Sequence, residues 1–92
     1  MPALSQQEIQ TRLSGLPAWK VVNGELERVF SLNDFVAALA FVNQVGSLAE
    51  EAGHHPDIDI RYNRVRLALV THDAGGITAK DFDLAAALNR LA

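Results

Sequence analysis

The dipeptide Asn23-Gly24, in the middle of the stretch WKVVNGELERVF, constrains the fold more than any other feature of this sequence. Asn-Gly is the strongest short signal for a two-residue β-hairpin turn, because both central residues of that turn need positive φ angles. Strand-forming residues flank the dipeptide on both sides. The sequence therefore predicts two antiparallel strands joined at Asn23-Gly24.

A second hairpin is predicted further along the chain. We place its tight turn at Asn63-Arg64, between two runs in which strand-forming residues occupy every second position. The runs are Ile58, Ile60 and Tyr62, followed by Val65, Leu67, Leu69 and Thr71.

Three helices are predicted, each from a hydroxyl residue that is followed three positions later by a carboxylate. In this capping box the two side chains satisfy the first free backbone N–H groups of the helix. The three pairs are Ser5 with Glu8, Ser31 with Asp34, and Thr78 with Asp81.

The sequence also predicts where these helices end and which of their faces are apolar. The first helix is expected over Gln6–Ser14, stopped by Gly15 and Pro17. The second should end near Ala52, with Gly53 as its left-handed cap. Apolar or small residues recur at helical spacing in the second and third helices: Leu32, Phe35, Val36, Leu39, Val42 and Gly46, then Leu84, Leu88 and Leu91.

The predicted order, α-β-β-α-β-β-α, indicates an α+β fold in which a four-stranded antiparallel sheet carries three helices on one face. Because 92 residues are below the usual length of two domains, we expect a single domain over residues 1–92. Such a small sheet leaves exposed edges, and pairing with another subunit is one way to cover them.

Composition narrows the classes of function. The absence of cysteine excludes disulfides, thiolate metal sites and a cysteine nucleophile, and it fits a reducing compartment. The N-terminus lacks the pattern of a signal peptide, and no segment has the roughly 20 apolar residues of a membrane span, so we expect a soluble cytoplasmic protein. A net charge of −3 argues against a nucleic-acid partner. The neighbouring Arg61, Arg64 and Arg66 are interpreted as a solvated hairpin face.

All three histidines lie where a predicted element ends and a loop begins. His54 and His55 follow the second helix, whose dipole favours the protonated imidazolium at its C-terminal end, and His72 follows the last strand. Pro56 restricts the backbone of His55. Three histidines at loop positions that can converge on a cleft indicate acid/base chemistry more strongly than one alone.

Structural and metal-binding roles are the alternatives. A single histidine is more often a structural residue. Three neutral imidazoles can hold zinc, with Asp57 or Asp73 as further ligands, although adjacent residues rarely aim both rings at one ion. Asp81 already has a structural role in its capping box, and Trp19 and Tyr62 are interpreted as core or rim aromatics.

The histidine motif resembles the signature of the pterin-4a-carbinolamine dehydratases. That signature is an acidic or polar residue, three spacers, His-His-Pro, five or six spacers, an aromatic residue, nine spacers, a histidine and a downstream aspartate. Here the matching positions are Glu50, His54, His55, Pro56, Tyr62, His72 and Asp81. The Trp19 region and the stretches FSLNDFVAALAFVNQVGSLAE and GITAKDFDLAAALNRLA are also similar to the family, so the resemblance covers nearly the whole chain. Gly53 and Ile58 stand where some relatives carry an acidic residue and an aromatic.

The resemblance implies an enzyme that dehydrates 4a-hydroxytetrahydrobiopterin, or a related 4a-hydroxytetrahydropterin, to the quinonoid dihydropterin without metal or organic cofactor. It implies that His54 and His72 protonate the leaving hydroxyl from one or other face, and that His55 holds the pterin and acts as base. Imidazole suits such proton transfers near neutral pH.

The resemblance also implies binding residues and partners. The supporting residues would be Glu50, Tyr62 and Asp81, and the enzyme would be a homodimer or homotetramer. Animal members also serve as dimerisation cofactors of a homeodomain transcription factor, so a protein-binding module is the alternative function. The residues expected to bind the pterin are Gly53, His54, His55, Pro56, Val70, Thr71, His72 and Asp73.

Overall fold

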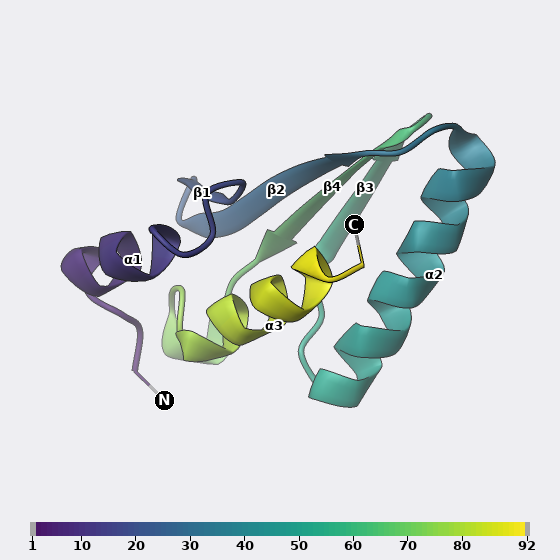
Figure 1. Ribbon diagram of the computed structural model, residues 1–92. Coiled ribbons are helices and arrows are strands. Elements are labelled where there is room, and N and C mark those ends of the chain that lie inside the picture. Colours follow the sequence, from purple (N-terminus) through teal and green to yellow (C-terminus); the bar gives the residue numbers. More distant parts are fainter. Residues whose placement is uncertain (1, 92) are drawn as a thin grey trace.

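The computed structural model describes residues 2–91. Its elements follow the predicted order, with one short 3-10 turn, η1, added before the last helix. Figure 1 shows the helices on one face of a four-stranded antiparallel sheet, so the predicted fold class is confirmed. The bounds are α1 Gln6–Leu13, β1 Lys20–Val22, β2 Glu25–Ser31, α2 Phe35–Ala52, β3 Asp57–Arg61, β4 Arg64–Leu69, η1 His72–Ala74 and α3 Ala79–Asn89.

The first hairpin turns at Asn23-Gly24, as predicted. Asn23 has φ 52° and Gly24 has φ 78°. Left-handed angles at both central positions are those of a type I′ turn, whose twist matches that of the flanking strands. β1 and β2 therefore pair antiparallel, with Val22 opposite Glu25 next to the turn.

The second hairpin turns one residue earlier than predicted. Arg61 pairs with Arg64 at the end of the β3–β4 ladder, so the turn consists of Tyr62 and Asn63 rather than Asn63 and Arg64. Asn63 is held there because its carbonyl accepts a hydrogen bond from the Leu32 N–H (2.8 Å) and its side-chain amide donates to the Leu32 carbonyl (3.0 Å). Tyr62 is therefore outside the strand in which it was predicted, and its side chain is exposed.

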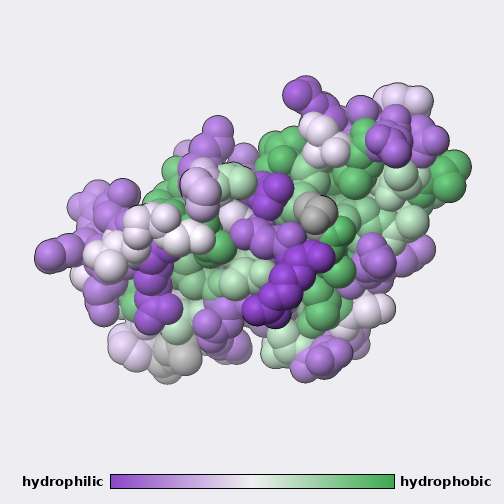
Figure 2. Space-filling model, viewed as in Figure 1, coloured by the Kyte–Doolittle hydropathy of each residue, from purple (hydrophilic) through white to green (hydrophobic). Residues whose placement is uncertain are grey.

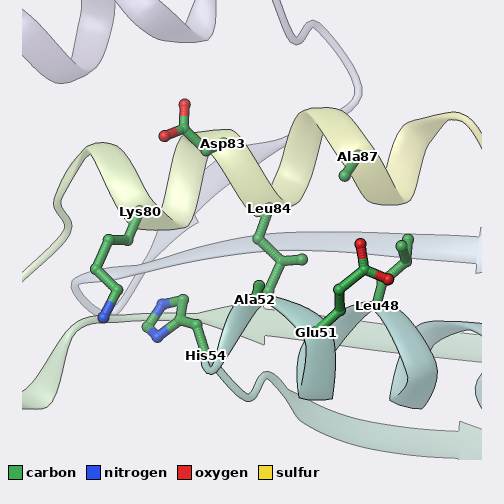
Figure 3. A pocket seen from close by; sticks show the side chains of 8 residues that line it. All are labelled: Leu48, Glu51, Ala52, His54, Lys80, Asp83, Leu84 and Ala87. Atoms are coloured by element: carbon green, nitrogen blue, oxygen red, sulfur yellow. The ribbon is translucent and has the colours of Figure 1, made fainter.

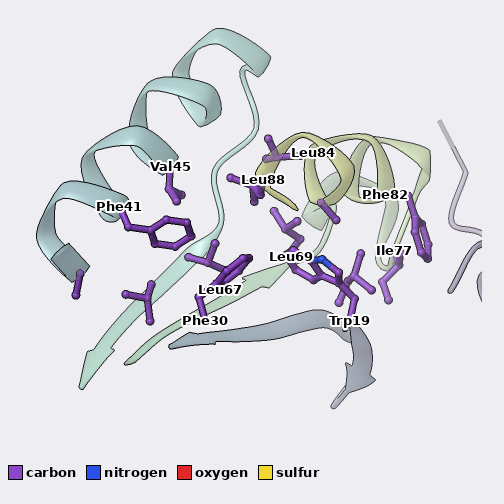
Figure 4. Close-up of a cluster of buried hydrophobic side chains, with 14 residues drawn as sticks. Trp19, Phe30, Phe41, Val45, Leu67, Leu69, Ile77, Phe82, Leu84 and Leu88 are labelled. Carbon is purple, nitrogen blue, oxygen red and sulfur yellow. The ribbon is translucent and has the colours of Figure 1, made fainter. Parts of the chain in front are cut away.

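The two hairpins join through β2 and β4, which gives the strand order β1-β2-β4-β3. In this central ladder Leu26 lies opposite Leu69, and Phe30 lies opposite Val65. These side chains belong to the core cluster. Figure 4 shows two of them, Phe30 and Leu69, on the side of the sheet that faces α2 and α3. Larger members of the core are Trp19, Leu26, Phe30, Phe41, Val45, Leu67, Leu69, Ile77, Phe82, Leu84 and Leu88.

The capping boxes predicted for α1 and α3 are confirmed. Ser5 and Glu8 bond reciprocally at the start of α1, and Thr78 and Asp81 do the same at the start of α3. The predicted stripe of α3 is also confirmed: Leu84 and Leu88 are buried, and Leu91 packs against the core.

A polar contact fastens the C-terminal end of α3 to the sheet. The side-chain oxygen of Asn89 accepts hydrogen bonds from Trp19 Nε1 (2.7 Å) and from an Arg28 guanidinium nitrogen (2.6 Å). The Arg28 guanidinium also lies 4.1 Å from the centre of the Phe30 ring. Burial at this place lowers the pKa of Arg28.

The predicted start of α2 is wrong. Ser31 is the last residue of β2 and pairs with Arg64, so the strand ladder retains it and it does not cap the helix. Asp34 is the N-cap instead, with its carboxylate accepting from the Ala37 N–H at 2.8 Å. Leu32, predicted to begin the helical stripe, lies before the helix.

α2 also buries a different stripe from the predicted one. Its buried residues are Ala38, Phe41, Val45 and Ala49. Phe35, Val36 and Leu39 of the predicted stripe are exposed, Val36 to 74%. The helix is apolar on more than one side, and contact with the sheet selects which side is buried. Figure 2 shows the remaining hydrophobic surface along α2. None of the helices within residues 2–91 is both long enough and apolar enough to span a membrane.

The helix-free face of the sheet is charged around the β3–β4 turn. Arg61 and Arg64 are exposed there, as interpreted from the sequence. Arg66 of the same cluster pairs with Glu27 at 2.9 Å, and this hydrogen bond raises the pKa of Arg66.

Candidate active site

The end of α2 determines where the first two histidines lie. Gly53 has φ 63°, as predicted for a left-handed cap, and its N–H donates to the Glu50 carbonyl. The N–H of His54 then donates back to the Ala49 carbonyl at 3.1 Å. These two bonds form a Schellman motif, which turns the chain sharply out of the helix and fixes the backbone of His54.

The His54 side chain is held by a buried carboxylate. Its Nε2 donates a hydrogen bond to Asp81 Oδ1 at 2.5 Å; the His54 side chain is 11% exposed and that of Asp81 is fully buried. A carboxylate accepts and does not donate, so this bond puts the ring proton on Nε2. His54 Nδ1 is therefore the nitrogen available for proton transfer.

Asp81 is itself held by two further donors. Its Oδ2 accepts from the Thr71 hydroxyl at 2.9 Å and from the Thr78 N–H at 2.8 Å. Because the Thr71 hydroxyl has one proton, Thr78 is the donor in the 2.8 Å bond between the two hydroxyls. One carboxylate thus connects the end of α2, the exit of β4 and the start of α3.

The loop after β4 brings the third histidine to the same place. Thr71 and Gly76 exchange backbone hydrogen bonds of 3.1 and 3.3 Å, which closes a small loop around η1. Gly75, with φ 72°, ends η1 in the left-handed conformation that a glycine adopts without strain. His72 is the first residue of η1 and is exposed on this loop.

All three histidines line one cavity of about 280 Å³. The predicted residues therefore come together in space, although the sequence separates them into two groups. Seven of the eight lining residues were predicted, and Lys80 was missed. Pro56, predicted to bind the substrate, precedes β3 and does not line the cavity. The lining residues are Gly53, His54, His55, Val70, Thr71, His72, Asp73 and Lys80.

Lys80 was missed because its role depends on tertiary packing. It lies in the first turn of α3, one residue before Asp81. The only signal in the sequence was this adjacency to a signature residue. Its position over the cavity follows from the way α3 packs against α2.

Of the three predicted supporting residues, Asp81 and Glu50 lie at the site and Tyr62 does not. Asp81 contacts His54, and Glu50 pairs with His55 Nε2, both side chains of this second pair being exposed. Tyr62 lies in the β3–β4 turn, at the opposite end of β3 from the histidines. Five residues of strand extend roughly 16 Å, so Tyr62 does not contact this site.

The residues considered as zinc ligands do not gather into a metal centre. Within residues 2–91, no group of three or more His, Asp or Glu side chains is placed to hold a metal ion. Asp73 lines the histidine cavity, whereas Asp57 is the exposed first residue of β3.

Comparison with known proteins agrees with this fold. A crystal structure described as transcriptional coactivator/pterin dehydratase from Brucella melitensis superimposes with a TM-score of 0.93, at 34% identity and over 98% of both chains. The α+β fold is therefore that of the pterin dehydratases.

The sequence comparisons identify the family. Residues 2–91 match the profile of pterin 4 alpha carbinolamine dehydratase. A relative from Acidobacterium capsulatum, named "Putative pterin-4-alpha-carbinolamine dehydratase", is 66% identical over 99% of both chains. One of the same name from Chloroflexus aurantiacus is 62% identical over 99% of this chain and 98% of its own. This chain belongs to the pterin-4-alpha-carbinolamine dehydratase family.

Proposed function

We propose that this protein dehydrates 4a-hydroxytetrahydrobiopterin to quinonoid dihydrobiopterin and water, as a step in tetrahydrobiopterin recycling. The observation that carries the proposal is the cavity in which His54, His55 and His72 meet. Its volume of about 280 Å³ is just under the roughly 300 Å³ at which sites for drug-sized ligands begin, which suits a small bicyclic ring. Family membership supplies the choice of a pterin.

The reaction needs two proton transfers and no change of oxidation state. A proton is added to the 4a-hydroxyl, which leaves C4a as water, and the proton on N5 is removed as the C4a–N5 double bond forms. General acid/base groups with pKa values near the working pH perform such transfers, and each typically contributes about 10²- to 10⁴-fold. The balance requires no metal and no organic cofactor.

In the proposed mechanism His54 and His72 protonate the leaving hydroxyl from one or other face, and His55 holds the pterin and takes the N5 proton. Asp81 positions His54, because it accepts from Nε2 and stabilises the doubly protonated ring, whose second proton passes from Nδ1 to the leaving hydroxyl. Glu50 accepts from His55 Nε2 and leaves the unprotonated Nδ1 of His55 to take the N5 proton. Backbone groups of Gly53, Val70 and Asp73 pair with the donor and acceptor edge of the ring. Thr71 lines the cavity, but its own backbone groups already bond to Gly76 and Ala74.

The test is stopped-flow ultraviolet absorbance of enzymatically generated 4a-hydroxytetrahydropterin. We expect the wild type to accelerate its decay, and His55→Ala to lose about 10²-fold or more of that acceleration. A chelator should leave the rate unchanged. No acceleration by the wild type would refute the proposal.

Tyr62→Ala is the matched control. Tyr62 is a signature residue, yet its side chain is 67% exposed in the distant turn. The Tyr62→Ala variant should therefore keep the wild-type rate. A loss as large as that of His55→Ala would show that the distal turn takes part in the reaction.

A second candidate function is a dimerisation or coactivator module that binds a transcription factor through α2. The exposed Phe35, Val36 and Leu39 favour it, because neighbouring apolar side chains exposed on one helix mark interaction surfaces. The Brucella melitensis neighbour carries the description transcriptional coactivator. In a pull-down, loss of a partner with Val36→Lys but not with His55→Ala would support this function.

The same apolar surface also supports the proposal of a homodimer or homotetramer. Exposed edge strands β1 and β3 offer a further place for subunits to pair. Sedimentation velocity on wild type and Val36→Lys tests this, and a wild type that sediments as a monomer contradicts it. The lack of cysteine is consistent with a cytoplasmic location.

A further inference from the structure

A positively charged groove lies on the helix-free face of the sheet, beside the β3–β4 turn. We call it the arginine groove; its volume is about 310 Å³, and three strands contribute its side chains. It is separate from the histidine cavity, because the turn is at the opposite end of β3 from His54, which Figure 3 shows between the end of α2 and the start of α3. The lining residues are Val29, Asp59, Arg61, Arg64 and Arg66.

The strand register places two of these arginines directly opposite one another. Arg61 pairs with Arg64 at the end of the β3–β4 ladder. Their side chains point to the helix-free face, because Ile60 and Val65 of the preceding pair pack in or against the core. Like charges directly opposite one another destabilise a sheet, so the fold alone gives no reason for this pair.

The ion pairs around the groove leave Arg64 without a partner. Arg66 pairs with Glu27 at 2.9 Å, and Arg61 lies 3.6 Å from Asp59. Within residues 2–91, no carboxylate forms an ion pair with Arg64, which is exposed. Three guanidinium groups therefore face two carboxylates, and one positive charge is in excess at the end formed by Arg61 and Arg64.

The turn between these two arginines has a second unfavourable feature. Tyr62 has φ 53°, a left-handed angle that is uncommon for a residue with a bulky side chain. Strained conformations and other locally unfavourable choices concentrate at binding and active sites. A like-charged pair that encloses a strained residue therefore indicates a binding role for this end of the sheet.

The charges indicate which kind of anion fits the groove. A single carboxylate balances the excess of one positive charge, whereas a phosphate dianion would leave an excess of negative charge beside Asp59 and Glu27. The chain as a whole has a net charge of −3, which repels a polyanion such as nucleic acid. We therefore expect a ligand with isolated carboxylates.

The floor of the groove indicates that the ligand also has an apolar side chain. Val29 is 48% exposed there. It lies two positions from Ser31, the residue opposite Arg64. Two positions of extended chain span about 7 Å. An extended segment with an acidic side chain at Arg64 therefore places the side chain two residues further along at Val29.

We propose that the arginine groove docks an acidic segment of a partner protein, in which an aspartate or glutamate lies two residues from an aliphatic side chain. The carboxylate accepts hydrogen bonds from Arg61 and Arg64, whose planar guanidinium groups suit its two oxygens. The aliphatic side chain contacts Val29. The inference is independent of the proposed function, because no residue lines both the groove and the histidine cavity.

A blocked peptide, acetyl-Ser-Glu-Thr-Val-Ser-amide, tests the groove. It is titrated into the isotope-labelled full chain, and binding is followed in heteronuclear NMR spectra. We expect the largest shifts at residues 29–31 and 59–66. Glutamine in place of the peptide's glutamate should weaken binding about 10-fold, and raising the salt from about 50 mM to about 500 mM should weaken it about threefold or more.

Arg64→Gln and Lys20→Gln are matched variants. Each removes one positive charge from the helix-free face, but Lys20 lies on β1, opposite Glu27 and outside the groove. Arg64→Gln should weaken binding of the peptide about 10-fold and Lys20→Gln less than about twofold. Because Arg64→Gln relieves the like-charged pair, it should raise Tm by about 1–4 °C. Equal weakening by the two variants, or a lower Tm for Arg64→Gln, would overturn the inference.

Other results would assign the groove to a different occupant or to none. The inference fails if the glutamate peptide shifts no resonance of the groove. It also fails if a phosphoserine peptide or a short oligothymidine binds at these residues more than about 10-fold tighter, since the groove would then recognise phosphate. If sedimentation velocity shows that Arg64→Gln dissociates an oligomer of the wild type, the occupant is a second copy of this chain and the inference is wrong.

Discussion

The Asp81 carboxylate has two roles: it stabilises the fold by accepting from Thr71 and Thr78, and it holds the His54 ring. The substitution Asp81→Asn separates these roles. An asparagine has nearly the same shape, but its side chain has a single acceptor oxygen. If that oxygen keeps the bonds from Thr71 and from the Thr78 N–H, the amide nitrogen faces His54 Nε2. Two donors cannot bond to one another, so Nε2 must accept from the amide and His54 cannot hold the second ring proton that it needs to act as an acid.

The size of the effect follows from these bonds. A hydrogen bond to a charged group contributes about 1.5–3 kcal/mol and a neutral one about 0.5–1.5 kcal/mol. Three bonds that each lose about 1–1.5 kcal/mol with the charge give an expected destabilisation of about 3–4.5 kcal/mol, or roughly 12–36 °C in Tm for a domain of this size. Without the second ring proton His54 is a poor acid, so the dehydration rate should also fall about 10- to 100-fold at temperatures where the variant is folded.

Thr78→Ala is the control for stability. It removes the hydroxyl that accepts from the Lys80 N–H and should cost about 1–2 kcal/mol as a lost cap. The bond between His54 and Asp81 remains, so the rate should stay within about threefold of the wild type. Thermal unfolding and the stopped-flow assay are measured on both variants. If Asp81→Asn keeps the wild-type rate, or if Thr78→Ala loses as much, Asp81 does not act through the protonation of His54.

Three further predictions concern the fold. Asn89→Ala leaves the Trp19 and Arg28 donors without their partner, so the free energy of unfolding should fall by about 1–3 kcal/mol in urea titration; an unchanged midpoint would contradict this. The Ser5 hydrogen bonds lower the pKa of Glu8, so its stabilisation is present above the unfolded pKa of about 4.3 and is lost as pH falls through the folded value. Glu8→Gln should accordingly lower Tm at pH 7 but not at pH 2, and an equal loss at both would exclude the charge as the cause. Gly53→Ala forces a β-carbon into φ 63°, which costs about 1–2 kcal/mol, whereas Gly53→Asn should cost less; equal Tm values would show that the cap does not require this conformation.

The features that could be predicted from the sequence are those decided by neighbouring residues. Asn23-Gly24 determines its own turn, and Thr78 and Asp81 cap α3, because each pair acts over two to four positions. The role of Ser31 and the register of the second turn were assigned wrongly for one reason. The ladder with β4 keeps Ser31 in a strand, and the hydrogen bond to Leu32 holds Asn63 as the second residue of the turn, and both of these partners are distant in sequence.

The same distinction applies to the candidate site. The motif that carries the family resemblance identified three of the eight residues that line the histidine cavity, and four more were predicted from their positions next to these histidines in the sequence. It missed Lys80, whose place depends on packing between helices, and it included Tyr62, whose place depends on the length of β3. The buried face of α2 was equally undetermined, since several of its sides are apolar enough to be buried.

The strand order β1-β2-β4-β3 has a consequence for how the active site is made during folding. Each hairpin closes a loop of a few residues, whereas the central ladder must bring Leu26 to Leu69. Long-range closure costs more chain entropy, so we expect the hairpins and α2 to gain structure first. His54, His55 and His72 flank the β3–β4 hairpin, whose ladder ends with Asp57 opposite Ala68, so this one hairpin brings the three histidines together. Asp81, which holds His54, lies on α3 and reaches it only when α3 has packed against the rest of the fold, so the onset of dehydratase activity in a refolding experiment would report the docking of α3.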